Sequence, residues 1–385
     1  MPTLYEILGV QPNDDADTLR SAYRRLARLH HPDVSQDPKA HEIMARINEA
    51  FETLIDPARR MEYDAMLAGG LVEPAPPPRR KPSQPKPVVV GLLKKLRGNR
   101  TPIYGLSFAP DTGRLATCAF DNEIALWDLV EGAQQQKRKA EGCTIASIRA
   151  LRHGAVVGTG AVEHLLSYCR MDDEGMHTWR LPVEEWVSCA SVSPDGRTIA
   201  TGSVGKTLSL LEAQDGSPRV SRRAHAESIT AIGWSDDGQL LATGSADASV
   251  KLWHGSNGAL LSTFQAIRSA VTALSISPDN RYLAVAAVDL SIRVFNLSSG
   301  SLVKVLFGHH KPIEGLAFHP NGWLFASASR DGSVGLWSAG QGLAKLILPC
   351  SDLPVTSVAF SPDGTRLAAA GLDRTIKIFE VAAKG

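Results

Sequence analysis

The chain has 385 residues, of which 43% are hydrophobic, and this length suits one small and one large globular domain. The formal net charge is only +1, which argues against a protein that binds nucleic acid mainly through electrostatics. Five cysteines without paired spacing argue for a reducing cytoplasm and against a disulfide framework or a Cys-x-x-Cys zinc module. The sequence shows no apolar run long enough for a membrane span, and we expect no signal peptide.

An amphipathic helix is predicted first, from Asp15 to His30. Apolar residues recur there at helical spacing on one face, and arginines recur four residues apart on another. Asp14 and Asp17 suit the start of this helix because carboxylates accept its free backbone N–H groups. Pro32 disfavours the α conformation at the residue before it and therefore ends the helix.

A second apolar stripe runs from Ile43 to Leu54 and can pack against the first helix. We therefore predict an antiparallel helical hairpin that exposes the tripeptide His31-Pro32-Asp33 at its tip. An exposed tip offers no pocket that would exclude water or shift a pKa, so we do not expect His31 and Asp33 to act as the acid and base of an enzyme.

With these segments in this order, residues 1–68 resemble the J domain of DnaJ-type co-chaperones. The resemblance rests on segments in register: Tyr5-Glu6-Ile7-Leu8-Gly9, Ala22-Tyr23-Arg24-Arg25-Leu26-Ala27, His31-Pro32-Asp33, Asn48-Glu49-Ala50-Phe51 and Arg59 to Asp64. His30 departs from the family, which usually has tyrosine there. The resemblance implies a domain that docks on a DnaK-type chaperone holding ATP and triggers hydrolysis.

By position, the resemblance assigns a triggering loop and a docking face. The loop consists of His31, Pro32 and Asp33. The docking face consists of Arg20, Tyr23, Arg24 and Arg25. Guanidinium groups pair with acidic surface and steer the encounter of two proteins, whereas the alternative for each arginine is a solvated helix face.

Residues 69–87 are rich in proline, with arginine and lysine between the prolines, and predict a semi-rigid linker. A spacer is the simpler interpretation. The alternative is a basic contact with nucleic acid or anionic lipid, but no aromatic residues lie among the charges to stack on bases.

From residue 88 to 385 the dominant feature is an internal repeat of 42 residues. Turn residues recur in seven copies, at Asp111, His153, Asp195, Asp237, Asp279, Asn321 and Asp363. A period of about 40–45 residues with short alternating segments is typical of four-stranded propeller blades. The region resembles the WD-repeat family, so the expected fold is multidomain, an all-α J-domain hairpin followed by an all-β seven-bladed propeller.

The repeat also predicts how the propeller closes. Residues 92–96 align with residues 302–306, five periods later, and should form the outer strand of the last blade, which removes free sheet edges. The family's buried hydrogen-bond network is matched in two blades, by Asp247 with Ser245, His225 and Trp253, and by Asp331 with Ser329, His309 and Trp337. Because these roles recur around the ring, we expect them to be structural and neither catalytic nor metal-binding.

The second and third blades depart most from the repeat. The same step of 42 residues defines a tryptophan position, with Trp127, Cys169, Leu211, Trp253, Phe295, Trp337 and Phe379. It also defines the turn acids, with Asp121, Glu163, Gly205, Asp247, Asp289, Asp331 and Asp373. Cys169 and Leu211 depart from the first series, and Gly205 departs from the second. The existence of these two blades therefore follows from spacing more than from side chains.

One position of the repeat could form a partner-binding face. The residues before the turn acids are Phe120, Val162, Val204, Ala246, Val288, Arg330 and Leu372. In the WD-repeat family this turn lies on a face that commonly binds partners, and a mostly apolar circle with one arginine would suit an extended apolar or acidic peptide. The alternative is that these side chains cap the propeller core, and spacing alone does not decide between them.

The prediction is a cytoplasmic J-domain co-chaperone that stimulates a DnaK-type ATPase while its propeller recruits a client or scaffold protein. We expect no enzymatic activity, cofactor, metal, nucleic acid or membrane partner. The main alternative is a propeller scaffold of a multiprotein assembly whose J domain only mediates docking. A propeller hydrolase would need a pocket with clustered acid, base or metal-ligand residues, and the regular repeat offers none.

Overall fold

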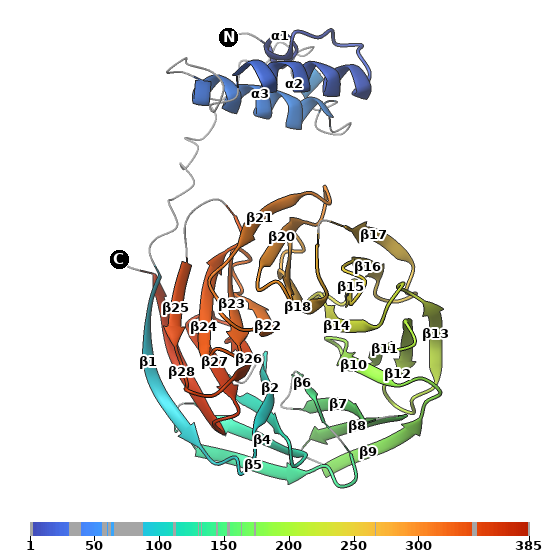
Figure 1. The fold of residues 1–385 in the computed structure, drawn as a ribbon, viewed down its shortest axis with the longest axis vertical. Helices are drawn as coiled ribbons and strands as arrows, with labels where there is room; N and C mark the ends of the chain where they lie inside the picture. The colour runs from blue at the N-terminus through green and yellow to red at the C-terminus, as the bar shows by residue number, and fades with distance from the viewer. Residues whose placement is uncertain are drawn as a thin grey trace. The chain divides into compact units, whose positions relative to one another are not determined.

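The computed structural model describes residues 3–30, 40–55, 60, 63–64 and 88–383, with gaps at 111–112, 130, 132, 144, 152–154, 163, 173–174, 266 and 341–344. The chain divides into two compact units, Met1–Pro82 and Ser83–Gly385. The first is helical and the second is a ring of β-sheets (Figure 1). The multidomain fold expected from the sequence is confirmed.

The helical unit contains α1 (Leu4–Leu8), α2 (Ala16–His30) and α3 (Ala40–Ile55). Thr3 and Glu6 form a capping box at the start of α1, and Gly9 ends α1 in the left-handed conformation with φ of 66°. The three helices share a core of Tyr5, Leu8, Leu19, Ile47, Ala50 and Leu54. The apolar stripes predicted from the sequence thus face each other.

The start of α2 agrees only in part with the sequence prediction, and Pro32, which is expected to end the helix, lies outside the described residues. The described part of the helix extends to His30. At its start, the Asp15 carboxylate accepts the Thr18 backbone N–H at 2.8 Å, whereas Asp14 accepts the N–H of Gln11 in the preceding turn. The capping residue is therefore Asp15, because Asp14 is used to shape the approach to the helix.

The second unit consists of seven four-stranded antiparallel sheets, which are the blades of a propeller (Figure 1). Blade 1 contains β2 (Ile103–Phe108), β3 (Leu115–Ala119), β4 (Glu123–Asp128) and β5 (Ala133–Lys139). Blade 2 contains β6 (Ser147–Ala150), β7 (Val156–Val162), β8 (Leu165–Asp172) and β9 (Gly175–Pro182). Blade 3 contains β10 (Val187–Val192), β11 (Thr198–Ser203), β12 (Thr207–Glu212) and β13 (Pro218–Arg223). Blades 4 and 5 contain β14 (Ile229–Trp234), β15 (Leu240–Ser245), β16 (Val250–His254) and β17 (Leu260–Phe264); and β18 (Val271–Ile276), β19 (Tyr282–Ala287), β20 (Ile292–Asn296) and β21 (Leu302–Leu306). Blade 6 contains β22 (Ile313–Phe318), β23 (Leu324–Ser329), β24 (Ser333–Ser338) and β25 (Lys345–Pro349).

Blade 7 combines both ends of the repeat region. It contains β26 (Val355–Phe360), β27 (Arg366–Gly371), β28 (Thr375–Ala383) and, as its outer strand, β1 (Val88–Arg97). β1 pairs antiparallel with β28 from Val88 opposite Ala383 to Arg97 opposite Thr375. The pairing corresponds to the five-period offset in the sequence, and it ties the two ends of the ring together.

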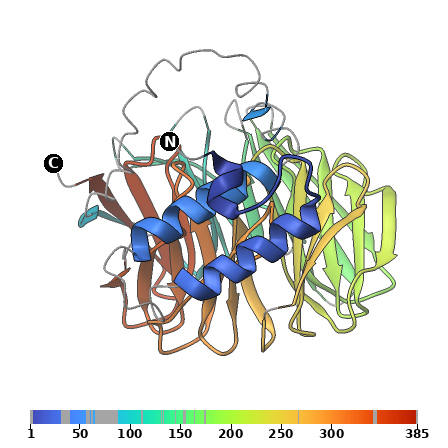
Figure 2. The same cartoon turned by 90° about the horizontal axis from the view of Figure 1, so that it is seen from above.

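The blades bury their central strands against their neighbours, and Figure 2 shows the sheets edge-on, with strands running between the two faces of the ring. β3, β11, β23 and β24 are buried along their whole length. The outer strands are the most exposed, as the pattern of β13 illustrates. Apolar contact between blades therefore holds the ring together, while the turns at both faces stay accessible.

The closing strand gives a direct test of this architecture. Leu96 is 4% exposed and packs in a cluster shared by blades 1 and 7, whereas Leu93 on the same strand is 53% exposed. We expect Leu96→Ala to lower the free energy of unfolding by about 3 kcal/mol because it leaves a cavity, and Leu93→Ala to change it by less than about 0.5 kcal/mol. Urea denaturation followed by tryptophan fluorescence measures both. Equal losses for the two variants would contradict closure by a packed β1.

Candidate functional site

An arginine outside the predicted site holds the helical unit together. Arg60 Nε donates to Tyr5 Oη at 3.1 Å, and its Nη2 donates to the carbonyls of Pro12 and Asp14 at 2.8 and 2.7 Å. Tyr5 Oη in turn donates to the Asp64 carboxylate at 2.7 Å. The residues after α3 are thereby tied to α1 and to the turn before α2. A sequence pattern does not show this clamp, because two of its bonds go to backbone carbonyls.

The docking residues assigned by resemblance lie on α2. Arg25 is exposed, and Tyr23 is half-buried with its ring stacked on Phe51 at a centroid distance of 4.3 Å. The side chains of Arg20 and Arg24 are outside the described residues, as is the whole loop His31-Pro32-Asp33. Tyr23 therefore helps to pack α2 against α3, and Arg25 is available to a partner.

In the propeller, blades 4 and 6 contain the expected buried network. His225 Nδ1 lies 3.2 Å from Asp247 Oδ2, its Nε2 lies 2.8 Å from Thr243 Oγ1, and Trp253 Nε1 donates to the same hydroxyl at 2.8 Å. In blade 6, His309, Ser327, Asp331 and Trp337 repeat the arrangement. The hydroxyl that joins histidine to tryptophan is Thr243 or Ser327, whereas Ser245 and Ser329, which the sequence suggested, bind loop carbonyls with their Oγ atoms.

These networks keep the turn acids ionised. Burial opposes ionisation, but hydrogen bonds from Ser249 and the Ala226 backbone outweigh it and lower the pKa of Asp247 to about 2. Burial also lowers the pKa of His225, so the neutral imidazole is favoured. Because both folded pKa values lie below their unfolded values, this stabilisation is present at neutral pH and is lost as the pH falls, first for the histidine and then for the acid. Such groups stabilise the fold and are not poised for catalysis near pH 7.

Blades 5 and 7 bind the turn acid in a different way. Arg293 on β20 is buried, and its Nη2 donates to Asp289 Oδ2 at 2.7 Å. Lys377 on β28 pairs with Asp373 in the same manner. A cation four residues after the acid on the third strand therefore replaces the histidine of the preceding loop.

Blade 3 uses a carboxylate from another position in the chain. Glu185, in the loop before β10, accepts hydrogen bonds from the hydroxyls of Ser203 and Thr207. A Cβ atom on Gly205 would lie 2.4 Å from the Glu185 carboxyl carbon, so the side chain of Glu185 fills the space beside the missing turn acid. The sequence shows the gap at Gly205, but not its replacement twenty residues earlier.

The described residues of blade 2 show neither the acid network nor a tryptophan at the repeat position, and its turn acid, Glu163, lies outside them. Cys169 takes the tryptophan position and its Sγ lies 3.6 Å from the Gly158 carbonyl oxygen, and burial raises the pKa of this thiol to about 12. The neighbouring Thr159 hydroxyl is buried without a hydrogen-bond partner among the described residues. A thiol of high pKa in an apolar core is unreactive, so Cys169 serves packing.

The turns predicted to form a partner-binding face lie beside the loops that enter each blade. The backbone N–H groups of Phe120, Val204, Ala246, Val288, Arg330 and Leu372 each donate to a carbonyl of that loop. Phe120, Val204 and Val288 are 66%, 50% and 53% exposed, and Arg330 is exposed as well. These exposures argue against the alternative that the three apolar side chains cap the core.

The other residues of the predicted partner-binding face add less exposed apolar surface. Leu372 is half-buried, and the side chain of Val162 is outside the described residues. Arg330 Nε donates to Glu314 Oε1, so its charge is already paired. This pairing weakens the expectation of an acidic ligand on this face and leaves its apolar side chains as the main feature.

Sequence reasoning missed three apolar residues near this face. Trp186 is 54% exposed, and its carbonyl accepts the Val204 N–H. Tyr104 is exposed beside Phe120 with ring centroids 6.1 Å apart, and Leu353 is exposed in the loop before β26. We call Tyr104, Phe120, Trp186, Val204, Val288 and Leu353 the turn-face patch. Trp186 and Leu353 stand in loops that vary between repeats, so only their exposure identifies them.

Comparisons with known proteins agree with this division of the chain. A family model described as "DnaJ domain" matches residues 3–64. A model described as "WD domain, G-beta repeat" matches residues 91–128, 176–210, 216–254, 258–296, 300–338 and 344–380, which is more than half of the chain. The longest unmatched segment of the repeat region, residues 129–175, contains most of the irregular blade 2.

The chain therefore belongs to the WD-repeat family and carries a DnaJ domain. A "Chaperone protein DnaJ" of Dictyoglomus thermophilum is 54% identical over 67 residues, which is 17% of each chain. A "Chaperone protein DnaJ 1" of Aquifex aeolicus is 50% identical over 64 residues, 17% of this chain and 18% of the relative. A "Curved DNA-binding protein" of Escherichia coli is 53% identical over 62 residues, 16% of this chain and 20% of the relative. The chain thus spans a fifth or less of the length of these relatives.

The described residues contain no group of three or more histidine, cysteine, aspartate or glutamate side chains that could hold a metal ion. No helix in this part of the chain is long and apolar enough to cross a membrane.

The replacement in blade 3 predicts a measurable coupling. We expect Glu185→Ala to lower the free energy of unfolding by about 1 kcal/mol, because two hydroxyls lose their acceptor. Gly205→Asp alone should also destabilise, since it forces two carboxylates together. In the double variant Glu185→Ala with Gly205→Asp, the new aspartate should again accept the hydrogen bonds of the two hydroxyls. The double-mutant cycle should therefore show a favourable coupling of about 1 kcal/mol.

The control for this cycle is the exposed neighbour Glu184. Glu184→Ala should leave the free energy of unfolding unchanged, with or without Gly205→Asp. If Gly205→Asp has the same effect whether residue 185 is glutamate or alanine, the two positions do not share one acceptor site.

Proposed function

We propose that this protein is a co-chaperone that stimulates the ATPase of a DnaK-type chaperone while its propeller recruits a client or scaffold protein. The observation that carries the proposal is the tripeptide His31-Pro32-Asp33 within a segment matched by the DnaJ family model. About half of the residues in this segment are identical in two chaperones named DnaJ. The similarity to the curved DNA-binding protein covers only the same segment, so it adds no reason to expect DNA binding here.

The helical unit suits such a role because it presents charge on a rigid helix. The shared core and the Arg60 clamp fix α2 relative to α1 and α3. Arg25 is exposed on α2, and Arg20 and Arg24 lie four residues apart on the same helix. A row of guanidinium groups steers and orients an acidic partner surface.

The propeller suits recruitment because its turn-face patch exposes large apolar side chains. Apolar and aromatic anchors that become desolvated supply most of the binding energy in a protein interface. We further propose that neither unit is an enzyme and that the protein works in the cytoplasm without a cofactor.

A measurement of ATP turnover tests whether the protein stimulates a DnaK-type chaperone. We expect the full-length protein to raise the steady-state ATP turnover of a DnaK-type chaperone, and Asp33→Asn to abolish this increase. The reason is that loss of the loop carboxylate removes a charge-assisted hydrogen bond to the chaperone. The measurement is phosphate release at several concentrations of each variant.

The matched control is Asp14→Asn, because the asparagine oxygen still accepts the Gln11 N–H. This variant should stimulate like the unmodified protein. If the protein gives no stimulation, or if Asp33→Asn stimulates fully, the co-chaperone function is refuted. Binding to the chaperone without stimulation would favour the alternative of a scaffold that uses its J domain only for docking.

A second measurement tests recruitment by the propeller. We expect the full-length double variant Phe120→Ser and Val288→Ser to lose proteins that the unmodified protein captures from its own cells, because two exposed anchors of the turn-face patch are removed. Quantitative mass spectrometry of the captured proteins reads out the loss. ATPase stimulation without a client should stay unchanged.

The control for capture uses exposed aliphatic residues elsewhere on the propeller. Leu302 and Val303 are 42% and 40% exposed on the outer strand β21. Leu302→Ser with Val303→Ser should leave the captured set intact. A captured set that survives the turn-face variant, or that is lost equally in the control, would place recruitment elsewhere.

A further inference from the structure

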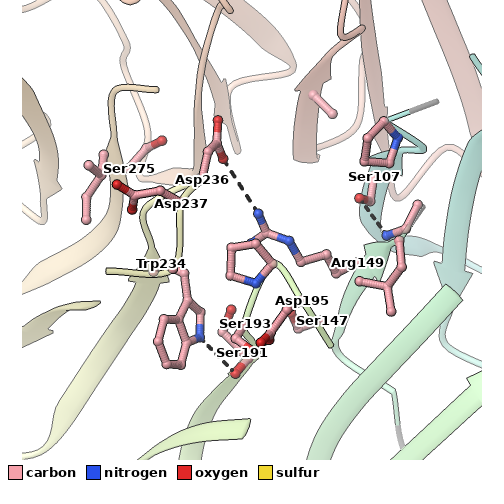
Figure 3. Close-up of a pocket in the computed structure, with 18 of the residues that line it drawn as sticks. Ser107, Ser147, Arg149, Ser191, Ser193, Asp195, Trp234, Asp236, Asp237 and Ser275 are labelled. Atoms are coloured by element: carbon pink, nitrogen blue, oxygen red, sulfur yellow. Dashed lines mark hydrogen bonds and ion pairs between the residues drawn. The ribbon is translucent and has the colours of Figure 1, made fainter. Parts of the chain in front are cut away.

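A second feature of the propeller lies at the ends of the innermost strands opposite the turn-face patch. Those strands and the turns that follow them line a cavity of about 1440 Å³ in the central channel (Figure 3). One inward position recurs every 42 residues around the cavity, with the residues Ser107, Arg149, Ser191, Gly233, Ser275, Ala317 and Ala359. Six of these have small side chains, and Arg149 in blade 2 is the exception.

The turns around the cavity contain a second exception. Five of them place a proline before the turn aspartate or asparagine, and Pro110, Pro194, Pro278, Pro320 and Pro362 all line the cavity. In blade 4 the same position is Asp236, which also lines the cavity. The corresponding residue of blade 2, Arg152, lies outside the described residues.

The two exceptional residues, Arg149 and Asp236, lie close together. Arg149 extends toward blade 4, and its Nη2 lies 3.6 Å from Asp236 Oδ1 (Figure 3). This separation allows an ion pair but is too long for a hydrogen bond. Within the part of the chain that the structure describes, the guanidinium of Arg149 donates no hydrogen bond to protein, although its side chain is only 27% exposed. Its charge is balanced while its donors remain available to a ligand.

Several other charged groups around the cavity already have partners. Asp195 accepts from Ser193, and Asp237 accepts from Ser235 and Asn280. Arg219 pairs with Glu212 at 3.2 Å. Arg149 therefore stands out as a half-buried cation whose planar fork matches a carboxylate.

We propose that this channel binds an extended acidic peptide segment, with one carboxylate of the peptide accepting hydrogen bonds from the Arg149 guanidinium. The cavity is larger than the roughly 300–1,000 Å³ of typical small-molecule pockets, which favours a peptide over a small anion. Apolar wall residues such as Pro278 and Pro320 can contact the peptide beside its acidic residue, and Ser191 and Ser275 can bind its backbone. This site is separate from the turn-face patch and goes beyond the proposed function.

The test is selection of peptides from a random display library on the full-length protein and on Arg149→Ser. Serine is the native residue at three equivalent positions of the ring, so this variant is compatible with the local fold. We expect the unmodified protein to enrich sequences with an aspartate or glutamate between apolar residues. Synthetic versions should bind Arg149→Ser on the order of 30-fold more weakly, and Arg149→Lys should be intermediate because it keeps the charge but loses the fork.

Three controls make the result specific. Replacing the acidic residue of the peptide by its amide should cause the same loss on the unmodified protein and no further loss on Arg149→Ser. Asp236→Asn should bind at least as tightly as the unmodified protein, because a competing carboxylate is removed. Arg223→Ser, on the outer strand β13, should leave binding unchanged.

The outcomes that would overturn the proposal are equally concrete. Enrichment of the same sequences on both proteins, or of sequences without acidic residues, would exclude Arg149 as the anchor. Saturable binding of acetate or inorganic phosphate alone, with no peptide selected, would make the cavity a small-anion site. If Arg149→Ser and Asp236→Asn lower the thermal stability equally and non-additively, and the protein selects no acidic peptides, the ion pair has only a structural role.

Discussion

The propeller depends on the pairing of β1 with β28, because a ring of seven sheets closes only if its last blade is completed by a strand from the other end of the repeat region. Closure leaves every blade with two neighbouring blades and removes the open edge at which another chain could pair. It also fixes all innermost strands in one register. Residues separated by whole periods therefore line the same circle. An unusual residue in one blade can thus be compared with its equivalents in the other six blades, which show what the fold requires.

The carboxylates beside the blade turns show which part of the repeat is constrained. Asp247 is bound by a histidine, Asp289 by an arginine and Asp373 by a lysine, while Glu185 supplies a carboxylate from a different loop. The common feature is a set of hydrogen-bond donors around a carboxylate beside the turn. The residue type that supplies the donor differs between blades. Side-chain motifs therefore fade in blades 2 and 3 although the fold continues.

The period of the sequence was sufficient to predict the number of blades and the closing strand, because both follow from spacing. The helical spacing of apolar residues likewise predicted the facing stripes of α2 and α3. What spacing could not give are contacts between positions whose separation is not a multiple of the period, such as Glu185 with Gly205, or contacts with backbone carbonyls, such as those of Arg60. The exposure of Phe120 and Val288 also required coordinates, since a turn residue next to a core strand can point either way.

Repetition thus helps to separate functional from structural residues. An apolar residue that recurs in the turns, such as Val204 or Val288, is compatible with the fold in several blades, so its exposure says that the surface tolerates it and a partner can use it. Arg149 and Asp236 are different, because the ring shows small residues and prolines to be adequate at their positions. An isolated charge costs desolvation energy inside a channel, and an ion pair at 3.6 Å with one exposed partner recovers little of that energy. Since the other blades have small residues and mostly prolines at these two positions, recognition of a ligand is the more economical reason for a guanidinium there.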